Sequence, residues 1–204
     1  MILIGMRDSA YVRRVAVSLK LMRVPFEHRL VSVFRHMDEF RKVNPVIKAP
    51  TLVCDDGTVL MDSTLILDYV EATLPAEARL TPVDIDRRRR ALHLVGFALS
   101  AVDKGVSLVY EREQRPADKR HEAWVARCID QIHAAFGVLE GAAAQAKPWL
   151  QGEALTSADV MLACAWRFNQ HYNAADVPAS RYPALAAFSA RAEALPEFAA
   201  VPLD

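Results

Sequence analysis

The spacing of apolar positions changes along the chain and predicts two regions of different structure. The first region opens with Ile2-Leu3-Ile4, a short apolar run typical of a buried strand. Residues 26–31 predict a second strand, which should run parallel to the first because a helix ending before Pro25 connects the two. That helix has two faces, with Val12, Val15, Leu19 and Met22 on the apolar one and Arg13, Arg14, Lys20 and Arg23 on the polar one.

The rest of this region predicts a short helix, a hairpin and a further helix. The short helix covers residues 38–43, and Ala49-Pro50 precedes a strand at 51–54. Asp56-Gly57 separates that strand from another at 59–61, and Asp-Gly between two apolar runs is a strong hairpin signal. Asp62-Ser63 then offers an N-cap for the next helix. The order of elements is βαβ-α-ββα, which is that of a thioredoxin-like domain.

Beyond Pro75 the strand signals end, and long helical periodicity predicts an all-helical region. We place Pro82 in the first turn of a long helix, where acidic neighbours suit the positive end of the helix dipole. Thr156-x-x-Asp159 matches a capping box that begins a third helix, and a last helix follows Pro183. Two apolar stripes predict an antiparallel pair of long helices: Leu92, Val95, Leu99, Val102, Val106 and Val109, then Val125, Ile129, Ile132, Phe136 and Leu139.

The prediction is therefore an α/β plus all-α protein, with a thioredoxin-like domain over 1–77 and an all-helical domain over 83–204. Hydrophobic residues make up 52% of the 204 residues and charged residues 25%, which excludes a disordered chain. The 25 basic and 25 acidic residues balance, so charge points neither to nucleic acid nor to an anionic membrane. Charges interrupt the apolar stretches, and no signal peptide is recognisable at the N-terminus, so we expect no membrane span and a cytoplasmic location.

Three cysteines, Cys54, Cys128 and Cys164, have no C-x-x-C spacing. Such an odd set favours reduced structural thiols over a disulfide framework or a zinc site. We therefore expect no metal, and we assign Cys54 to the core.

Three motifs occur in an order that resembles the glutathione transferase superfamily: Ser9-Ala10-Tyr11-Val12-Arg13-Arg14-Val15 after the first strand, Ile47-Lys48-Ala49-Pro50-Thr51-Leu52 before the third, and Asp62-Ser63 opening a helix. Residues 155–160 also resemble the capping segment of that family's helical domain. The likeness therefore covers the whole chain, and it is to the cytosolic, bacterial-like members with a serine-type active site. It implies glutathione as co-substrate.

The resemblance assigns a backbone role to Ala49-Pro50. Pro50 would follow a cis peptide bond, which turns the N–H and C=O of Ala49 outward to pair with the cysteinyl backbone of glutathione. Lys48 would neutralise the glycyl carboxylate. From the residues alone, the alternatives are an ordinary trans proline at the start of a strand and a solvated surface lysine.

Asp62 and Ser63 are assigned by the resemblance to the γ-glutamyl end of glutathione. The helix N-terminus at Ser63 suits a carboxylate, and Asp62 would face the ammonium group. The alternative is that both residues only cap the helix, because capping and binding use the same groups.

Ser9 is the catalytic residue that the resemblance implies. Its hydroxyl would donate a hydrogen bond to the glutathione sulfur, and together with the helix dipole it would stabilise the thiolate at neutral pH. The alternatives are that Ser9 serves as an N-cap, or that Tyr11 or Arg13 shares the work. No cysteine stands here, so thiol-disulfide exchange through a protein thiol is disfavoured.

The expected function is conjugation of glutathione to a small apolar electrophile by a homodimer formed through the long helices. Phe97, Tyr110 and Trp166 are candidates for the second-substrate pocket, although aromatic residues at helical spacing are more often core. A non-catalytic interaction module of the same fold and a glutathione-dependent isomerase or reductase remain open. The run Arg87-Arg88-Arg89-Arg90 should spread around its helix and be partly solvated and partly interface charge.

Overall fold

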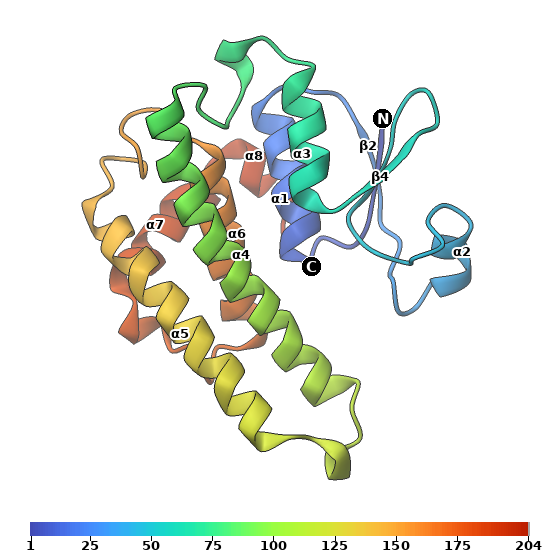
Figure 1. The fold of residues 1–204 in the computed structure, drawn as a ribbon, viewed down its shortest axis with the longest axis vertical. Coiled ribbons are helices and arrows are strands. Elements are labelled where there is room, and N and C mark those ends of the chain that lie inside the picture. The colour runs from blue at the N-terminus through green and yellow to red at the C-terminus, as the bar shows by residue number, and fades with distance from the viewer. Residues whose placement is uncertain (204) are drawn as a thin grey trace. The chain divides into compact units, whose positions relative to one another are not determined.

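The computed structural model describes residues 1–203, which group by their contacts into two compact units (Figure 1). The first unit is Met1–Val83 together with the segment that starts at Ala194, and the second is Asp84–Glu193. The predicted boundaries, 1–77 and 83–204, placed this last segment in the helical domain. In the structure it belongs with the first unit.

A four-stranded sheet in the order β2-β1-β3-β4 forms the centre of the first unit. The strands are β1 (Ile2–Ile4), β2 (Glu27–Arg29), β3 (Thr51–Val53) and β4 (Val59–Met61). β1 pairs parallel with β2, whereas β1–β3 and β3–β4 pair antiparallel. The predicted parallel pair and hairpin are both confirmed.

Three helices complete the predicted βαβ-α-ββα order: α1 (Ala10–Leu21), α2 (Met37–Arg41) and α3 (Ser63–Ala72). α1 packs against α3, and Figure 1 shows the two helices side by side. The apolar face of α1 is buried as predicted, with Val12, Val15 and Leu19 fully enclosed. A single turn, η1 (Ala76–Ala78), follows α3.

The polar face predicted for α1 is wrong at two positions, because Arg13 and Arg14 are buried. The Arg13 guanidinium donates from Nε to the Val201 carbonyl at 2.8 Å and from Nη2 to the Phe198 carbonyl at 3.5 Å. These carbonyls lie in and just after α8 (Pro196–Ala199), a short helix that the periodicity did not predict. Arg13 therefore binds the C-terminal segment to the first unit.

The second unit is entirely helical: α4 (Ile85–Glu113), α5 (Glu122–Gln145), α6 (Ser157–Tyr172) and α7 (Pro183–Glu193), with single turns η2 (Ala117–Lys119) and η3 (Ala179–Arg181). α4 packs against α5 and α6, and α7 packs against α5 and α6. Figure 1 shows α4 and α5 side by side and running in opposite directions, as predicted.

The start and the buried stripe of α4 differ from the prediction. The helix begins at Ile85, after Asp84 accepts a hydrogen bond from the Arg87 N–H at 2.9 Å, so Pro82 lies before it. Leu92 is 48% exposed, whereas Val95 and Val102 are buried as predicted. The other buried positions are Ala91, Ala98, Ala101, Gly105, Leu108 and Glu111. Four of these other positions carry Ala or Gly, whose small size lets neighbouring helices approach closely, and a stripe of large apolar residues does not include them.

One 18-residue window of α4 has a mean hydropathy of 1.4 and passes a length-and-composition test for a membrane span. The longest run of α4 without a charged residue is 91–102, so charges interrupt the apolar stretch of this helix as expected. The buried residues of α4 pack against α5 and α6 within the unit. A helix in the core of a helical domain passes the same test, because the residues that it buries are apolar.

Candidate functional site

Strand register brings the three predicted motifs to one end of the sheet. Ile4, the last residue of β1, pairs with Thr51 at the start of β3, and Thr51 pairs with Met61 at the end of β4. The loop after β1, the loop before β3 and the turn after β4 therefore leave the sheet at the same end. Ser9, Ala49-Pro50 and Asp62-Ser63 lie on these three segments, and the N-termini of α1 and α3 begin there.

The turn from β1 into α1 lies tightly against the loop before β3. Gly5 has φ +144°, and a Cβ at this position would lie 2.5 Å from Val12 Cγ2 and 3.0 Å from Ala49 Cβ. A glycine is required here, because any side chain would push the two segments apart. Ser9, four residues further on, is the N-cap of α1, and its Oγ accepts from the Val12 N–H at 3.4 Å.

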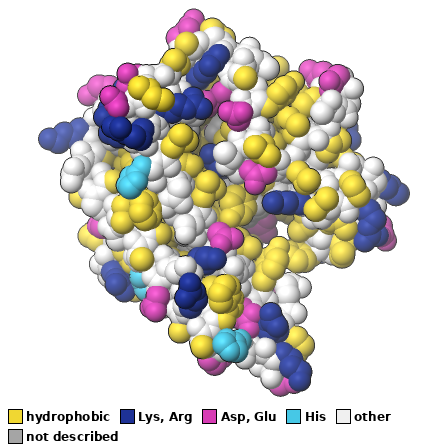
Figure 2. Space-filling model, in the orientation of Figure 1, with side chains coloured by type: hydrophobic (Ala, Val, Ile, Leu, Met, Phe, Trp, Pro, Cys, Tyr) yellow, Lys and Arg dark blue, Asp and Glu magenta, His cyan; other side chains and the backbone are white. Residues whose placement is uncertain are grey.

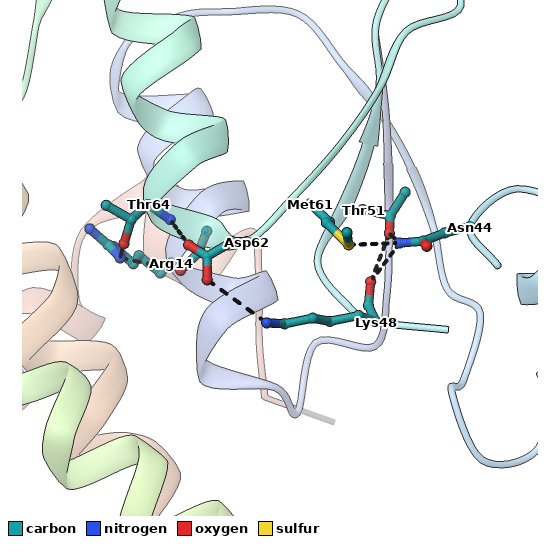
Figure 3. Close-up of polar contacts among 8 residues, drawn as sticks. Arg14, Asn44, Lys48, Thr51, Met61, Asp62 and Thr64 are labelled. Carbon is teal, nitrogen blue, oxygen red and sulfur yellow. Dashed lines mark hydrogen bonds and ion pairs between the residues drawn. The ribbon is translucent and has the colours of Figure 1, made fainter. Parts of the chain in front are cut away.

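The peptide bond between Ala49 and Pro50 is cis. Thr51 Oγ1 donates to the Lys48 carbonyl at 2.7 Å, and Asn44 Nδ2 donates to Thr51 Oγ1 at 2.8 Å (Figure 3). These hydrogen bonds fix the backbone of the segment that contains Ala49 and Pro50. Among the hydrogen bonds of residues 1–203, none uses the N–H or C=O of Ala49. The N–H donor and the C=O acceptor of Ala49 are therefore both available to pair with an extended peptide.

The N-terminus of α3 carries a carboxylate on its outer side and a hydroxyl on its inner side. Asp62, with φ +75°, is the N-cap, and its Oδ1 accepts from the Thr64 N–H at 2.9 Å. Its Oδ2 lies 4.0 Å from Lys48 Nζ, and both side chains remain about half exposed. Figure 3 shows the Lys48 side chain extending toward Asp62 across the end of the sheet.

Arg14 is a functional candidate that the sequence analysis missed. Its side chain is 4% exposed and donates from Nη1 to Ser63 Oγ at 3.2 Å and to Thr64 Oγ1 at 3.1 Å (Figure 3). A guanidinium is thus buried beneath the first turn of α3, where the helix dipole is also positive. The signal in the sequence was an arginine inside a helix whose neighbours are apolar, but its partners lie 49 and 50 residues away.

Charge at this end of the sheet is arranged for a ligand that carries both signs. The two helix N-termini, Arg14 and Lys48 favour carboxylates, whereas Asp62 favours an ammonium group. The free backbone of Ala49 adds recognition of a peptide unit. A small zwitterionic peptide with a second carboxylate fits this pattern.

The candidates for other chemistry at this site, an arginine partner for sulfur and a reactive cysteine, are both buried. Arg13, one alternative partner for sulfur, donates to backbone carbonyls of the C-terminal segment. Cys54 is buried as predicted, and burial raises the pKa of its thiol. Within residues 1–203, no group of three or more His, Cys, Asp or Glu side chains is placed to hold a metal ion.

The three aromatic candidates for a second-substrate pocket do not lie together in the second unit. Phe97 and Tyr110 are both on α4, and their thirteen-residue separation corresponds to about 20 Å along a helix. Trp166 is only 4% exposed and packs edge-on against Phe136 and Tyr182, with ring centroids 5.4 and 5.9 Å away. Trp166 belongs to the helical core, and the pocket assignment stays a prediction for the other two.

Two family models match the chain. The N-terminal domain of glutathione S-transferase matches residues 3–78, and the C-terminal domain of glutathione S-transferase matches residues 97–196.

Curated relatives and solved structures agree with these matches. A probable maleylacetoacetate isomerase from Vibrio cholerae is 30% identical over 210 residues, which cover 98% of this chain and 94% of the relative. An uncharacterized GST-like protein, YibF, from Escherichia coli K12 is 30% identical over 80% of this chain and 79% of its own length.

Two structures of glutathione transferases hold glutathione or a derivative. One, from Methylobacterium radiotolerans in complex with glutathione sulfonate, has a TM-score of 0.91 at 26% identity and covers 100% of this chain and 95% of its own. The other, a family member from Pseudomonas fluorescens Pf-5 with bound glutathione, has a TM-score of 0.85 at 28% identity, with coverage of 100% and 98%.

Proposed function

Since the chain belongs to the glutathione S-transferase family and is a glutathione-dependent transferase, we propose that glutathione binds at the polar end of its first sheet. The observation that carries this site is the convergence of Ser9, the cis Ala49-Pro50 segment and Asp62-Ser63 through the register of β1, β3 and β4. The second reactant is a small apolar electrophile.

Each part of glutathione has a matching group. The γ-glutamyl carboxylate binds at the N-terminus of α3, where Ser63 and the underlying Arg14 supply hydrogen bonds and positive charge. Asp62 accepts the ammonium group, and the backbone of Ala49 pairs with the cysteinyl unit. Lys48 neutralises the glycyl carboxylate. The ion pair of Lys48 with Asp62 is long at 4.0 Å, so both groups remain available to a ligand.

The cysteinyl sulfur is then positioned at the start of α1. Ser9 Oγ accepts only a long hydrogen bond from Val12, so its proton is available to donate to a thiolate. The positive end of α1 stabilises the same charge. Holding this nucleophile beside a bound electrophile accelerates conjugation by proximity and by raising the thiolate fraction.

Replacing Asp62 with asparagine is expected to weaken glutathione binding by about 10-fold or more. A charge-assisted hydrogen bond contributes about 1.5–3 kcal/mol, and asparagine keeps the cap while losing the charge. Calorimetric titration measures the change. Asp68→Asn, which alters an exposed carboxylate of the same helix, is the control and should leave the affinity for glutathione within about two-fold of the wild type. If Asp62→Asn binds glutathione as tightly as Asp68→Asn does, Asp62 is not part of the site.

Isomerisation is the second candidate function, favoured by the full-length similarity to the Vibrio cholerae relative. Glutathione would then add to a cis double bond and leave after rotation, so it is not consumed. Turnover of maleylacetoacetate without loss of glutathione identifies this activity, whereas consumption of both glutathione and a halogenated aromatic electrophile identifies conjugation. Glutathione binding without turnover of either substrate points to a non-catalytic interaction module of this fold.

We also propose a cytoplasmic homodimer. Exposed apolar side chains lie on α4 and α5, where Leu92 is 48% and Val138 40% exposed, and on α3, where Leu65 is 63% exposed. Exposed apolar side chains of this size are typical of an interface.

Replacing Leu65 with aspartate is expected to shift the molecular mass in solution from dimer to monomer, because a carboxylate cannot be buried unpaired in an apolar contact. Light scattering after gel filtration measures the shift. Val46→Asp, at an exposed apolar position in the loop before β3, is the control and should remain dimeric. A Leu65→Asp protein that is still a dimer would exclude this helix from the interface.

A further inference from the structure

The arginine run at the start of α4 has no part in the glutathione site, yet three of its four members line one cavity. The cavity has a volume of about 610 Å³ and lies within the second unit; it is lined by Arg87, Arg89, Arg90, His93, Leu94, Leu150 and Gln151. Arg88 is not among the residues that line it. Helical spacing explains why these residues of α4 line the cavity together, because Arg87, Arg90 and His93–Leu94 follow one another at intervals of three to four residues along one face. Arg87, Arg89 and Arg90 are exposed and Arg88 is half-buried, which agrees with the expectation that the run is partly solvated.

The other lining residues, Leu150 and Gln151, lie in a turn whose backbone is fixed by hydrogen bonds. Trp149 and Gly152 form a backbone bridge, and between them the Leu150 N–H donates to the buried carboxylate of Asp159 at 2.8 Å. Gln151 Nε2 donates to the Arg87 carbonyl at 3.1 Å and joins the turn to the helix. The cavity is thus formed by two elements in fixed relation, and its size suits a small organic ligand.

Positive charge in this cavity exceeds negative charge. Arg89 pairs with Asp86 at 3.0 Å, but among residues 1–203 Arg87 and Arg90 have no ion pair. The whole chain has a formal net charge of zero, so this excess is a local feature. Figure 2 shows Lys and Arg side chains, with Asp and Glu side chains next to them, gathered near a histidine over the N-terminal part of α4. A concave surface lined by one sign of charge concentrates the opposite charge.

We propose that this cavity binds an organic phosphate. Two guanidinium groups on one helix face match a dianionic phosphate, because their planar N–H donors pair with its oxygens two at a time. Leu94 and Leu150 supply apolar surface for the carbon part of the ligand, and the edge of His93, which packs against Phe97 at 5.1 Å between ring centroids, lies beside them. The site is separate from the glutathione site, which lies in the first unit.

Calorimetric titration of the full chain with phenyl phosphate and with inorganic phosphate tests the proposal. Saturable binding of phenyl phosphate, tighter than that of inorganic phosphate by at least about three-fold, is the expected result. The double variant R87Q/R90Q should weaken it by about 10-fold or more, whereas R88Q, which removes the same charge from the same run outside the cavity, should stay within about two-fold. Circular dichroism melting of each variant shows whether it is folded, and the single variant R90Q provides the same comparison if the double variant is not.

Three results would overturn the proposal. They are the absence of saturable phenyl phosphate binding at millimolar concentration, equal weakening by R88Q and R87Q/R90Q, and equal affinity for phenyl phosphate and inorganic phosphate. Saturating glutathione should leave phenyl phosphate binding unchanged, and competition between the two ligands would place the phosphate in the glutathione site instead.

Discussion

Replacing Asp159 with alanine is expected to lower the free energy of unfolding by about 3–5 kcal/mol. The carboxylate is fully buried and accepts three hydrogen bonds: from the Thr156 N–H at 2.7 Å, from Thr156 Oγ1 at 2.7 Å and from the Leu150 N–H at 2.8 Å. Burial raises the pKa of this carboxyl group, and the three donors oppose that shift. Alanine leaves the donors unpaired in the interior, which costs more than the bonds contribute.

Urea unfolding followed by tryptophan fluorescence measures this change, since the buried Trp149 lies beside Leu150 in the same turn. Asp159→Asn should also be strongly destabilising, because its amide N–H groups would face other donors. Asp130→Ala, at an exposed carboxylate of α5, is the control and should change stability by less than about 0.5 kcal/mol. A loss below about 1 kcal/mol in Asp159→Ala would show that the capping box does not hold α6.

The second large effect is expected at Ser9. Ser9→Ala should lower kcat/KM for conjugation by about 10²–10³-fold, the range found when one donor to a developing or resident anion is removed from an enclosed site. The loss should appear mainly in kcat at saturating glutathione, because the hydroxyl faces the sulfur and the other contacts hold the peptide. Steady-state kinetics with a fixed electrophile measures it.

Ser9 also caps α1, so a loss of activity needs to be separated from a loss of stability. Removing an N-cap serine costs about 1 kcal/mol, which thermal unfolding detects. Ser9→Thr keeps the hydroxyl and the cap and should recover most of the rate. If Ser9→Ala lowers the melting temperature but leaves kcat/KM unchanged, Ser9 is a helix cap and nothing more.

Local patterns in the sequence were sufficient to predict the strands of the first unit and the helices α1, α2 and α3, but not α8. Strands such as Ile2–Ile4 and the hairpin around Asp56-Gly57 are encoded within a few residues, and so is the capping box at Thr156 and Asp159. The cis bond before Pro50 followed from family resemblance, since no single-sequence signal distinguishes it from a trans bond.

Contacts between residues distant in sequence could not be predicted in this way. Arg13 and Arg14 were assigned to solvent because helical periodicity counts arginine as polar, whereas their partners are carbonyls 185 and 188 residues away and hydroxyls 49 and 50 residues away. Trp166 fills the core and does not line a pocket, because it packs against Phe136 and Tyr182, which are 30 and 16 residues away in the sequence.

The pH titration of the ultraviolet thiolate absorbance of glutathione bound to the wild-type chain tests the central proposal most directly. A free thiol of this type ionises near pH 8.5, and donation from Ser9 with the α1 dipole should lower the apparent pKa of the bound sulfur into the range of about 6–7.5. A thiolate signal at neutral pH that requires the protein would support the site. Bound glutathione that ionises as it does in free solution would contradict it.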